Sequence, residues 1–307
     1  MTKTGESCAA LFARPSFGGH ERFTFRHGWL KKGFDAVVEN SYIFSQKDAF
    51  VVLGVGKNMA ASIRYWGLTL GLFEPDTGRS RALRPSRIGS ALFADDGWDP
   101  YLEDIGSLWL LHWKLASNQE RGLVWYLAFS RYYDVEFHKS TLVEFLKTQL
   151  AQRGLDTTES MIEREFDVFI RTYVPARAQK KDGEENLGCP LEELNLIYLI
   201  PGESVYRFDV GPKPSLPSPI LGYALLEFLS DKIAQQRTAL VDECVYSPGS
   251  PGQIFKLDED SVMNYLADLE LLTRGALRVQ ETAGIRQIYL HATSRDLGWQ
   301  LLTTYYG

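Results

Sequence analysis

Cysteine is scarce in this sequence, and long apolar runs are missing. Its 307 residues include 3 cysteines, Cys8, Cys189 and Cys244, and no two of them have the spacing of a metal-binding or redox motif. Isolated thiols are typical of a reducing compartment, so we expect a cytoplasmic protein. The apolar runs are short and interrupted, which predicts no membrane span. The N-terminal stretch lacks a basic start followed by an apolar core, so we expect no secretion signal.

A nucleotide-binding phosphate loop is also missing. The letters "GVGK" at 54–57 suggest one, but the motif G-x-x-x-x-G-K-[ST] requires Gly and then Ser or Thr where this chain has Val51 and Asn58. We therefore expect no nucleotide cofactor.

The charge is unevenly distributed along the chain. The formal net charge is −6, but residues 1–87 contain 13 Lys and Arg against 7 Asp and Glu, a net of +6. The remaining 220 residues contain 20 against 32, a net of −12. A basic segment joined to an acidic one indicates that one end of the molecule meets phosphates, while the rest meets protein or solvent.

The composition is that of a globular protein, with 45% apolar and 23% charged residues, and the chain is long for a single core. We expect a mainly α (α+β) protein built from several winged-helix-like helix-turn-helix units with small β-hairpins. Three domains are predicted: a basic winged-helix DNA-binding domain at 1–90, a helical middle region with a second helix-turn-helix unit at 91–175, and a C-terminal winged-helix-like domain at 176–307.

The first domain has the pattern of a winged helix-turn-helix. Apolar spacing predicts a helix over 29–40, a short helix within 45–54 and a second long helix over 57–71, followed by the turn "EPDTG" between extended residues. The outer face of the second long helix and the supposed wing supply the candidate DNA contacts Lys57, Asn58, Arg64, Tyr65, Arg79, Arg81, Arg84 and Arg87. The alternative is a helical hairpin with a solvated basic face.

The middle region repeats the helical pattern with the opposite charge. Residues 99–116 predict a buried helix in which His112 is a core residue, and "GLVWYLAF" at 122–129 predicts a buried strand or a short helix. A capping box at 141–144 predicts the start of the second helix-turn-helix. The outer face of its second helix is expected to carry Glu159, Glu163, Glu165 and Asp167, which would repel phosphates.

The last domain shows the same order once more. A helix over 220–236 and another starting near residue 260 precede a hairpin that turns at 282–284. The repetition lies in the architecture, since no repeat of individual residues is visible.

Four stretches carry a resemblance that runs in order from about Phe17 to Tyr289: "GGHERFTFRHGWLKKGFDAV", "LGVGKNMAASIRYW", "YLEDIGSLWLLHW" and "SPGQIFKLDEDSV...AGIRQIYL". The chain resembles the uncharacterised-domain family encoded beside DNA phosphorothioation genes, which includes the SspB subunit of the Ssp modification system. The resemblance implies a DNA-binding subunit of a DNA phosphorothioate modification and anti-phage defence system, which nicks double-stranded DNA to allow sulfur insertion. It also implies a cysteine desulfurase, an ATPase and an ATP-pyrophosphatase-like enzyme as partners.

The segment Phe17–Asp35 holds the residues that a nicking reaction could use. His20, Glu21 and His27 are candidates for a base, for ligands of a divalent metal such as Mg²⁺ or Mn²⁺, and for an acid that protonates the leaving oxygen. Their cationic neighbours are the candidate phosphate contacts Arg22, Arg26, Lys31 and Lys32. For this segment, phosphate binding ranks first, structural capping second and catalysis third, because positioning contacts outnumber catalytic ones at a DNA interface.

Two other functions remain open at this point. A winged-helix protein without catalysis would be a DNA-binding adaptor or a transcriptional regulator, and its DNA affinity would depend steeply on salt. A protein-interaction scaffold would have winged helices that no longer contact nucleic acid, as the acidic face of residues 159–173 suggests.

Overall fold

The fold is that of a computed structural model, which describes residues 17–175, 188–291 and 294–307. Cys8 and the N-terminal stretch, for which no secretion signal is expected, lie outside these ranges. Helices make up most of the regular structure and the sheets are small and antiparallel, so the expected α+β class is confirmed. Within the described ranges, no helix has the length and apolarity needed to cross a bilayer.

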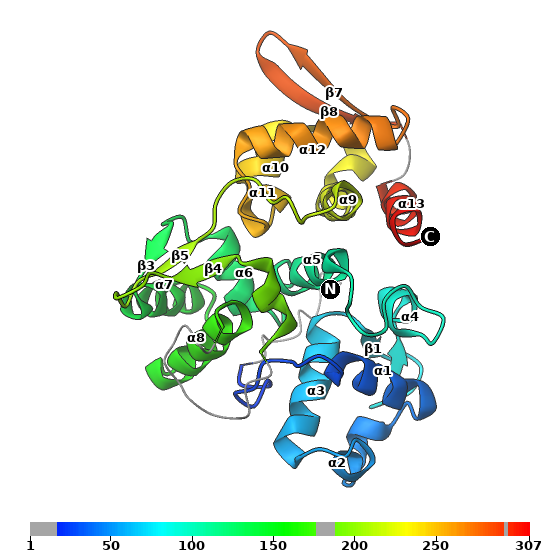
Figure 1. The fold of residues 1–307 in the computed structure, drawn as a ribbon, viewed down its shortest axis with the longest axis vertical. Coiled ribbons are helices and arrows are strands. Elements are labelled where there is room, and N and C mark those ends of the chain that lie inside the picture. The colour runs from blue at the N-terminus through cyan, green and yellow to red at the C-terminus, as the bar shows by residue number, and fades with distance from the viewer. Residues whose placement is uncertain (1–16, 176–187, 292–293) are drawn as a thin grey trace, which may run out of the picture.

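The N-terminal unit is a set of short helices with one hairpin (Figure 1). Its elements are α1 (Trp29–Glu39), η1 (Ile43–Ser45), α2 (Ala49–Val52), α3 (Lys57–Thr69), β1 (Phe73–Pro75), β2 (Leu83–Pro85) and α4 (Arg87–Phe93). These bounds agree with the helices and the turn expected from apolar spacing in this part of the chain.

Two glycines allow the neighbours of α3 to pack closely against it. A Cβ on Gly33 of α1 would lie 2.6 Å from Cγ2 of Ile63, and a Cβ on Gly67 of α3 would lie 2.1 Å from Cζ of Phe73. Both distances are too short for a van der Waals contact, so α1 and the hairpin approach α3 only because these positions lack a side chain. As a result, α3 is buried on the side of Trp66 and exposed on the side of Lys57.

The middle and C-terminal units follow in the chain. The middle unit contains α5 (Ile105–Ala116), α6 (Leu123–Ser130), β3 (Glu136–Phe137), α7 (Lys139–Gln152), α8 (Glu159–Tyr173), η3 (Pro190–Leu194), β4 (Ile197–Leu199) and β5 (Tyr206–Phe208). The C-terminal unit contains α9 (Ser218–Gln236), β6 (Thr238–Leu240), α10 (Val241–Tyr246), α11 (Pro251–Ile254), α12 (Glu259–Leu272), β7 (Leu277–Thr282), β8 (Ile285–Leu290) and α13 (Ser294–Tyr306).

The units share an order of elements. In the middle unit β3 is followed by α7, α8 and a hairpin, and the strands pair in the order β3-β5-β4. In the C-terminal unit β6 is followed by α10, α11, α12 and a hairpin, and the strands pair in the order β6-β8-β7. In the N-terminal unit the hairpin β1-β2 lies beside Ser41, whose carbonyl accepts a hydrogen bond from the N–H of Leu83 at 2.7 Å. By this order α3, α8 and α12 are equivalent helices, each the last before a hairpin.

The strand pairing crosses one of the predicted domain boundaries. The strands β4 and β5 follow residue 176 in the sequence, but β5 pairs with β3 at Glu136 and Phe137. The hairpin 197–208 therefore belongs to the sheet of the middle unit.

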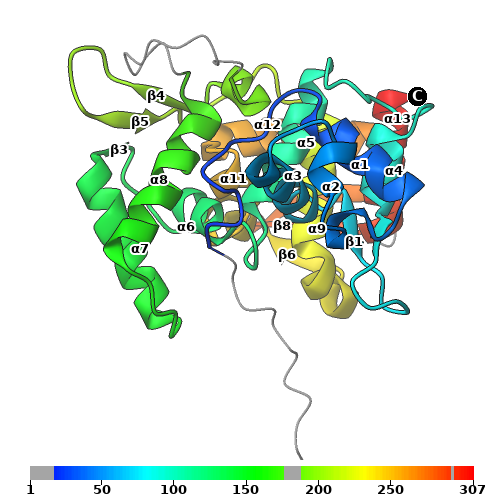
Figure 2. The ribbon, with the colours of Figure 1, turned by 90° about the horizontal axis from the view of Figure 1, so that it is seen from below.

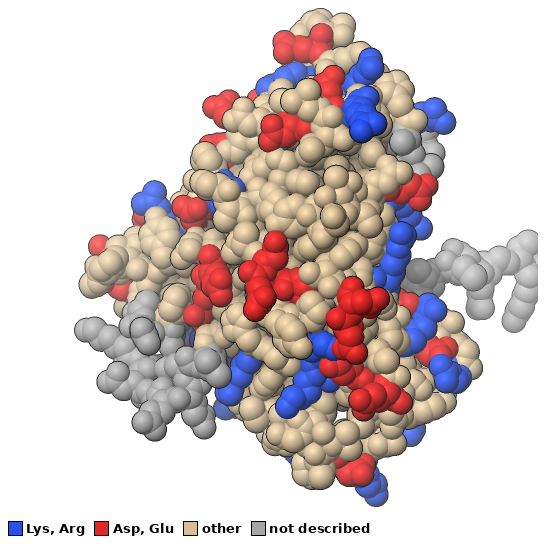
Figure 3. All heavy atoms as spheres, turned by 45° about the vertical axis from the view of Figure 1, so that its right-hand side comes forward, with Lys and Arg blue, Asp and Glu red and all other residues tan. Residues whose placement is uncertain are grey.

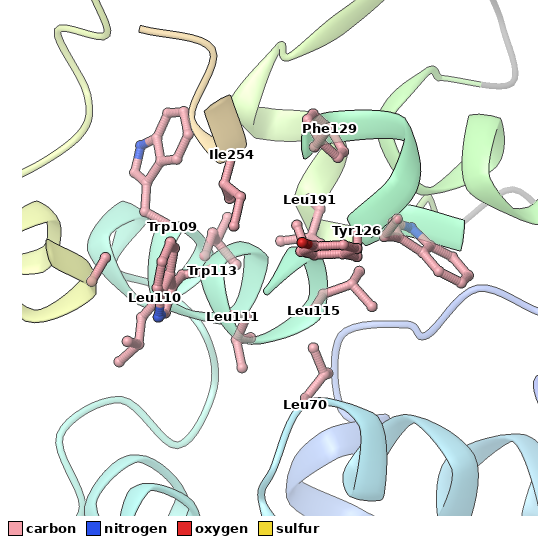
Figure 4. Packing of buried hydrophobic residues seen from close by; sticks show 14 of the residues in the cluster. Leu70, Trp109, Leu110, Leu111, Trp113, Leu115, Tyr126, Phe129, Leu191 and Ile254 are labelled. Carbon is pink, nitrogen blue, oxygen red and sulfur yellow. The ribbon is translucent and has the colours of Figure 1, made fainter. Parts of the chain in front are cut away.

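The helices α5 and α6 form the centre of the molecule (Figure 4). Trp109 and Trp113 of α5 and Phe129 of α6 are almost completely buried, and Leu70 after α3, Leu191 of η3 and Ile254 of α11 approach them from three sides. One apolar cluster thus joins all three units.

His112 of α5 is a core residue, as the sequence predicted. Its Nε2 lies 2.9 Å from the carbonyl oxygen of Ile254, and its Nδ1 lies 2.8 Å from the hydroxyl of Tyr173. A carbonyl only accepts hydrogen bonds, so Nε2 carries the proton and Nδ1 accepts one from the tyrosine. Burial lowers the pKa of His112 to about 4, with a smaller contribution from the charge of Lys256.

Lys256 and the helix α13 both tie the C-terminal unit to the rest of the chain. Lys256 is buried and its Nζ donates to the carbonyl oxygen of Phe129 at 2.8 Å, at the carboxyl end of α6, where a cation is favourable. The helix α13, which was not predicted, packs along α9, and its Tyr306 stacks on Trp98 in the loop after α4 with ring centroids 4.7 Å apart. Figures 1 and 2 both show α13 beside α4.

The starts of two helices differ from the prediction for a local reason. The helix predicted over 99–116 begins only at Ile105, because the Asp99 carboxylate accepts the N–H groups of Glu103 at 2.8 Å and Asp104 at 3.0 Å and holds these residues in a loop. The helix α7 begins at Lys139, before the expected capping box, and Thr141 instead accepts the N–H of His138 at 3.1 Å. The stretch 122–129, for which a strand or a helix was expected, forms the helix α6.

Candidate nucleic-acid interface

The exposed face of α3 is basic. Lys57, Asn58, Ala61 and Arg64 are all exposed and follow one another at the spacing of a single helix face. The residue before the helix is Gly56, whose lack of a side chain leaves the first turn without a side-chain cap. A phosphate at this end would meet helix N–H groups and a lysine together.

Tyr65, predicted as a DNA contact, lies in the core instead. Its side chain is 5% exposed, and its hydroxyl donates to the carbonyl oxygen of Arg121 at 2.9 Å. One step along a helix turns a residue by about a quarter of a circle, so Tyr65 leaves the face of Arg64 and packs against His20 and Trp66.

The arginines of the β1-β2 hairpin are mostly paired. Arg79 lies 2.7 Å from Asp76, and Arg84 lies 2.6 Å from Glu74. The guanidinium carbon of Arg87 lies 3.8 Å from the ring centroid of Trp299 of α13. Arg81 is exposed at a left-handed turn position with φ 64°. Phosphate contacts by Arg79, Arg84 or Arg87 would have to compete with these partners.

Lys31 and Lys32, also predicted as DNA contacts, line a depression of about 610 Å³ between α1 and α2. Nζ of Lys31 lies 2.6 Å from Asp35 and 2.8 Å from Asp95, and Nζ of Lys32 donates to the carbonyl oxygen of Leu53 at 3.0 Å. Burial opposes the charge of Lys31, but its hydrogen bonds to the two aspartates outweigh burial and raise its pKa. Figure 3 shows acidic side chains gathered beside basic ones on this face, so the surface there is mixed in charge.

His20 is buried between the N-terminal segment and α8, next to Glu165. It is 1% exposed; its Nδ1 accepts the N–H of Arg22 at 3.1 Å, and its Nε2 lies 3.1 Å from Oε1 of Glu165. The same carboxylate oxygen accepts the N–H of Gly18 at 2.6 Å. Nε2 and Glu165 do not have the geometry of a hydrogen bond, so their interaction is an electrostatic contact. Figures 1 and 2 show the segment from residue 17 passing between α8 and α3.

Glu165 therefore corrects the expected outer face of α8. It was predicted to face solvent with Glu159, Glu163 and Asp167, but it is 3% exposed, whereas the other three are exposed. The burial of an acid is compensated here by the backbone N–H of Gly18 and the ring of His20. A pair of this kind is hard to see in the sequence, because its members are 145 positions apart.

The remaining candidates of the segment stay near the surface. Glu21 and Arg22 are exposed and have φ values of 49° and 65°, and the carbonyl oxygen of Arg22 accepts from Arg171 of α8 at 2.8 Å. Arg26 lies over the ring of Trp29 at 5.4 Å. His27 is half exposed, with its Nε2 3.8 Å from Glu193. No hydrogen bond or ion pair in the described ranges joins His20, Glu21 and His27.

The side chains expected to hold a divalent metal do not fit one in this arrangement. The ring nitrogens of His20 face the N–H of Arg22 and the carboxylate of Glu165. No contact among the described residues brings the Glu21 carboxylate to the His20 ring. The carboxylates of Asp35 and Asp95 already share the ammonium of Lys31. Across the described ranges, no three His, Cys, Asp or Glu side chains come together as a metal-ligand group.

Comparison with known proteins gives one family and two structures. Residues 17–306 match the family described as "Protein of unknown function (DUF4007)". A crystal structure of SspB and a magnesium ion-bound crystal structure of SspB each match with 32% sequence identity and a TM-score of 0.86, over 95% of this chain and 88% of the other. No curated protein is significantly similar to the chain.

Proposed function

The chain belongs to the DUF4007 family and is an SspB-like protein, and we propose that it is the DNA-binding subunit of a DNA phosphorothioate modification system. In this proposal the face of α3 contacts double-stranded DNA, and the acidic middle and C-terminal units face the partner proteins. The partners would be the cysteine desulfurase, the ATPase and the ATP-pyrophosphatase-like enzyme of such a system, acting in anti-phage defence in the cytoplasm.

The observation that carries the proposal is the start of α3. A lysine in the first turn opposes the positive end of the helix dipole, and Gly56 in place of a side-chain cap forgoes roughly a few tenths of a kcal/mol of stabilisation. Folding alone gains nothing from either feature. A bound phosphate reverses both effects, because it accepts the amide N–H groups and neutralises Lys57.

The order of elements in the middle and C-terminal units supports a winged-helix interpretation, and the N-terminal unit shares their helices and hairpin. A strand, two helices and a hairpin with the middle strand contributed last are the parts of a winged helix, and in that fold the helix before the hairpin enters the major groove. We infer that α3 is the recognition helix and β1-β2 the wing. Asn58 and Arg64 are then the side chains suited to adenine and guanine.

Strand nicking is the finer part of the proposal. The burial of His20 favours a positioning role, in which its ring and Glu165 hold the exposed turn of Glu21 and Arg22 beside α8. Glu21 and His27 remain the accessible candidates for proton transfer, and Arg22 and Arg26 for phosphate binding. The magnesium ion-bound SspB structure makes Mg²⁺ the first ion to supply in an assay.

DNA binding is tested by fluorescence anisotropy with a labelled duplex at about 50 mM and about 200 mM salt. We expect binding that weakens steeply with salt, and a loss of at least tenfold in affinity for Lys57→Ala. The matched control is Arg164→Ala, which removes an exposed arginine from α8 and should leave the affinity unchanged. An equal loss in both variants would mean that binding follows net charge alone and would refute the role of α3.

Nicking is tested separately with supercoiled plasmid and the pure protein in Mg²⁺, in Mn²⁺ and in a chelator. Conversion to the open-circle form, lost in Glu21→Gln but kept in Arg164→Ala, is the expected result. DNA binding without nicking in any of the three conditions would instead support a non-catalytic adaptor or regulator. Absence of both activities would support a protein-interaction scaffold.

A further inference from the structure

Two arginines from different units lie on segments that are joined by hydrogen bonds. Arg64 belongs to α3, and Arg121 belongs to the loop between α5 and α6. Arg64 is exposed to solvent, but the protein around it desolvates it in part and lowers its pKa, and the nearby charge of Arg121 lowers the pKa further. Neither guanidinium makes a hydrogen bond or an ion pair with any residue in the described ranges, whereas Arg79, Arg84 and Arg286 each meet a carboxylate.

The loop that carries Arg121 is firmly attached to α3. Nδ2 of Asn118 donates to the carbonyl oxygen of Thr69 at 2.9 Å, and its Oδ1 accepts the N–H of Arg121 at 2.9 Å. The hydroxyl of Tyr65 donates to the carbonyl oxygen of Arg121 at 2.9 Å. These bonds hold the backbone of Arg121 beside Tyr65, the residue that follows Arg64, and they leave the guanidinium of Arg121 without a hydrogen bond.

The end of the loop is constrained as well. A Cβ on Gly122 would lie 2.3 Å from the carbonyl oxygen of Leu115, so only glycine allows the loop to turn this closely onto α5. The position of Arg121 is therefore set by packing and backbone hydrogen bonds. It does not depend on a partner for its own side chain.

The guanidinium groups of Arg64 and Arg121 meet no counter-charge among the described residues and repel each other. A single anion between them would remove the repulsion and take up their N–H donors. We propose that Arg64 and Arg121 together bind one backbone phosphate group of DNA, so that the α5–α6 loop forms part of the nucleic-acid interface. This inference rests on the proposed DNA binding and deepens it, since it adds a residue from outside the basic N-terminal third.

A phosphate is a better fit for this pair than a carboxylate of the protein or a base edge. Each guanidinium offers a planar fork of donors, and one phosphate group has enough acceptor oxygens to meet two forks from different directions. Contact with the same phosphate from α3 and from the α5–α6 loop would set the angle at which α3 enters the groove.

The test is a double-mutant cycle on duplex DNA with Arg64→Ala, Arg121→Ala and the double variant, measured by anisotropy over a series of salt concentrations. We expect Arg121→Ala to weaken binding about tenfold, as loss of a charge-assisted contact does. In the double variant the slope of log affinity against log salt should become shallower by about 0.9, the value for one phosphate. Arg131→Ala, which removes an exposed arginine at the other end of α6, should change neither quantity.

Each other outcome overturns a defined part of the inference. Unchanged affinity in Arg121→Ala, with the wild type binding normally, would refute the role of Arg121 and leave the proposed function standing. A slope change of about 1.8 in the double variant would mean two separate phosphates. Failure of the wild type to bind DNA would overturn both proposals. If Arg121→Ala does not fold, Arg121→Gln replaces it, because its side chain keeps the length while losing the charge.

Discussion

The helices α3, α8 and α12 occupy equivalent places in the three units, and their first turns are opposite in character. The helix α8 is capped by Thr158 and begins with Glu159, and α12 is capped by Asp258 and begins with Glu259 and Asp260. Both follow the rules for a stable helix start. The helix α3 has Gly56 and Lys57 in these places, so its start has no side-chain acceptor and no acidic residue.

This comparison separates what the shared architecture requires from what a particular surface is for. Acidic, capped starts are sufficient for α8 and α12 to fold and pack, so they indicate no ligand. The start of α3 forgoes stabilisation that the other two helices have, and departures of this kind are expected where a residue has been selected for binding.

The largest expected effect comes from reversing the charge of α3. The variant Lys57→Glu/Arg64→Glu should lose about a thousandfold in DNA affinity, about 4 kcal/mol, because two attractive phosphate contacts become repulsive. Its melting temperature should hold or rise, since Glu suits the first turn. Anisotropy and thermal denaturation measure the two quantities. Unchanged DNA affinity in this double variant would refute the claim that α3, unlike α8 and α12, binds DNA.

Acid should act on the centre of the molecule and spare the basic face. Burial lowers the pKa of His112 to about 4 from its ordinary 6.5, so the unfolded chain binds a proton that the folded chain does not over this interval. Stability should therefore fall by about 3 kcal/mol as the pH drops from 6.5 to 4. Urea titrations across this range check it, and His112→Gln should flatten the dependence, although its stability at neutral pH will be lower. If the stability of His112→Gln falls as steeply with pH as that of the wild type, groups other than His112 cause the pH dependence.

The junction between α8 and the N-terminal segment should be weaker than the core but measurable. Glu165→Gln keeps an acceptor for Gly18 but removes the charge beside His20, and we expect a loss of about 2 kcal/mol in the free energy of unfolding. The matched control on the same helix is Glu163→Gln, an exposed position where the change should stay below about 0.5 kcal/mol. Similar losses of unfolding free energy in Glu165→Gln and Glu163→Gln would show that the contact between His20 and Glu165 contributes no stability beyond the general effect of charge on α8.

The smallest effect is expected in the hairpin of the N-terminal unit. Arg84 and Glu74 form an exposed ion pair, so Arg84→Ala should change stability by less than about 0.5 kcal/mol. Arg84→Ala should weaken DNA binding less than Lys57→Ala does, because Arg84 must break its ion pair with Glu74 before it can contact a phosphate. A larger loss than that of Lys57→Ala would move the main contact from α3 to the wing.

Local signals made α3 and its surroundings predictable. Its bounds, its basic face and the hairpin after it follow from apolar spacing, a glycine stop and the turn "EPDTG". The core position of His112 followed from the apolar stripe that it shares. The same signals were weaker for Tyr65, because an aromatic residue at the edge of a stripe can face either way, and its hydroxyl finds its acceptor only in the distant loop at Arg121.

By itself, the sequence determined the helical character, the uneven charge and the basic outer face of α3, because these depend on neighbours within a few turns. Only the tertiary structure decided that His20 is buried against Glu165, that Arg79 and Arg84 are paired with carboxylates, and that the backbone of Arg121 is held at Tyr65 of α3. Each of these depends on two side chains far apart in the chain, and the burial or charge of one becomes defined only when packing brings the other to it.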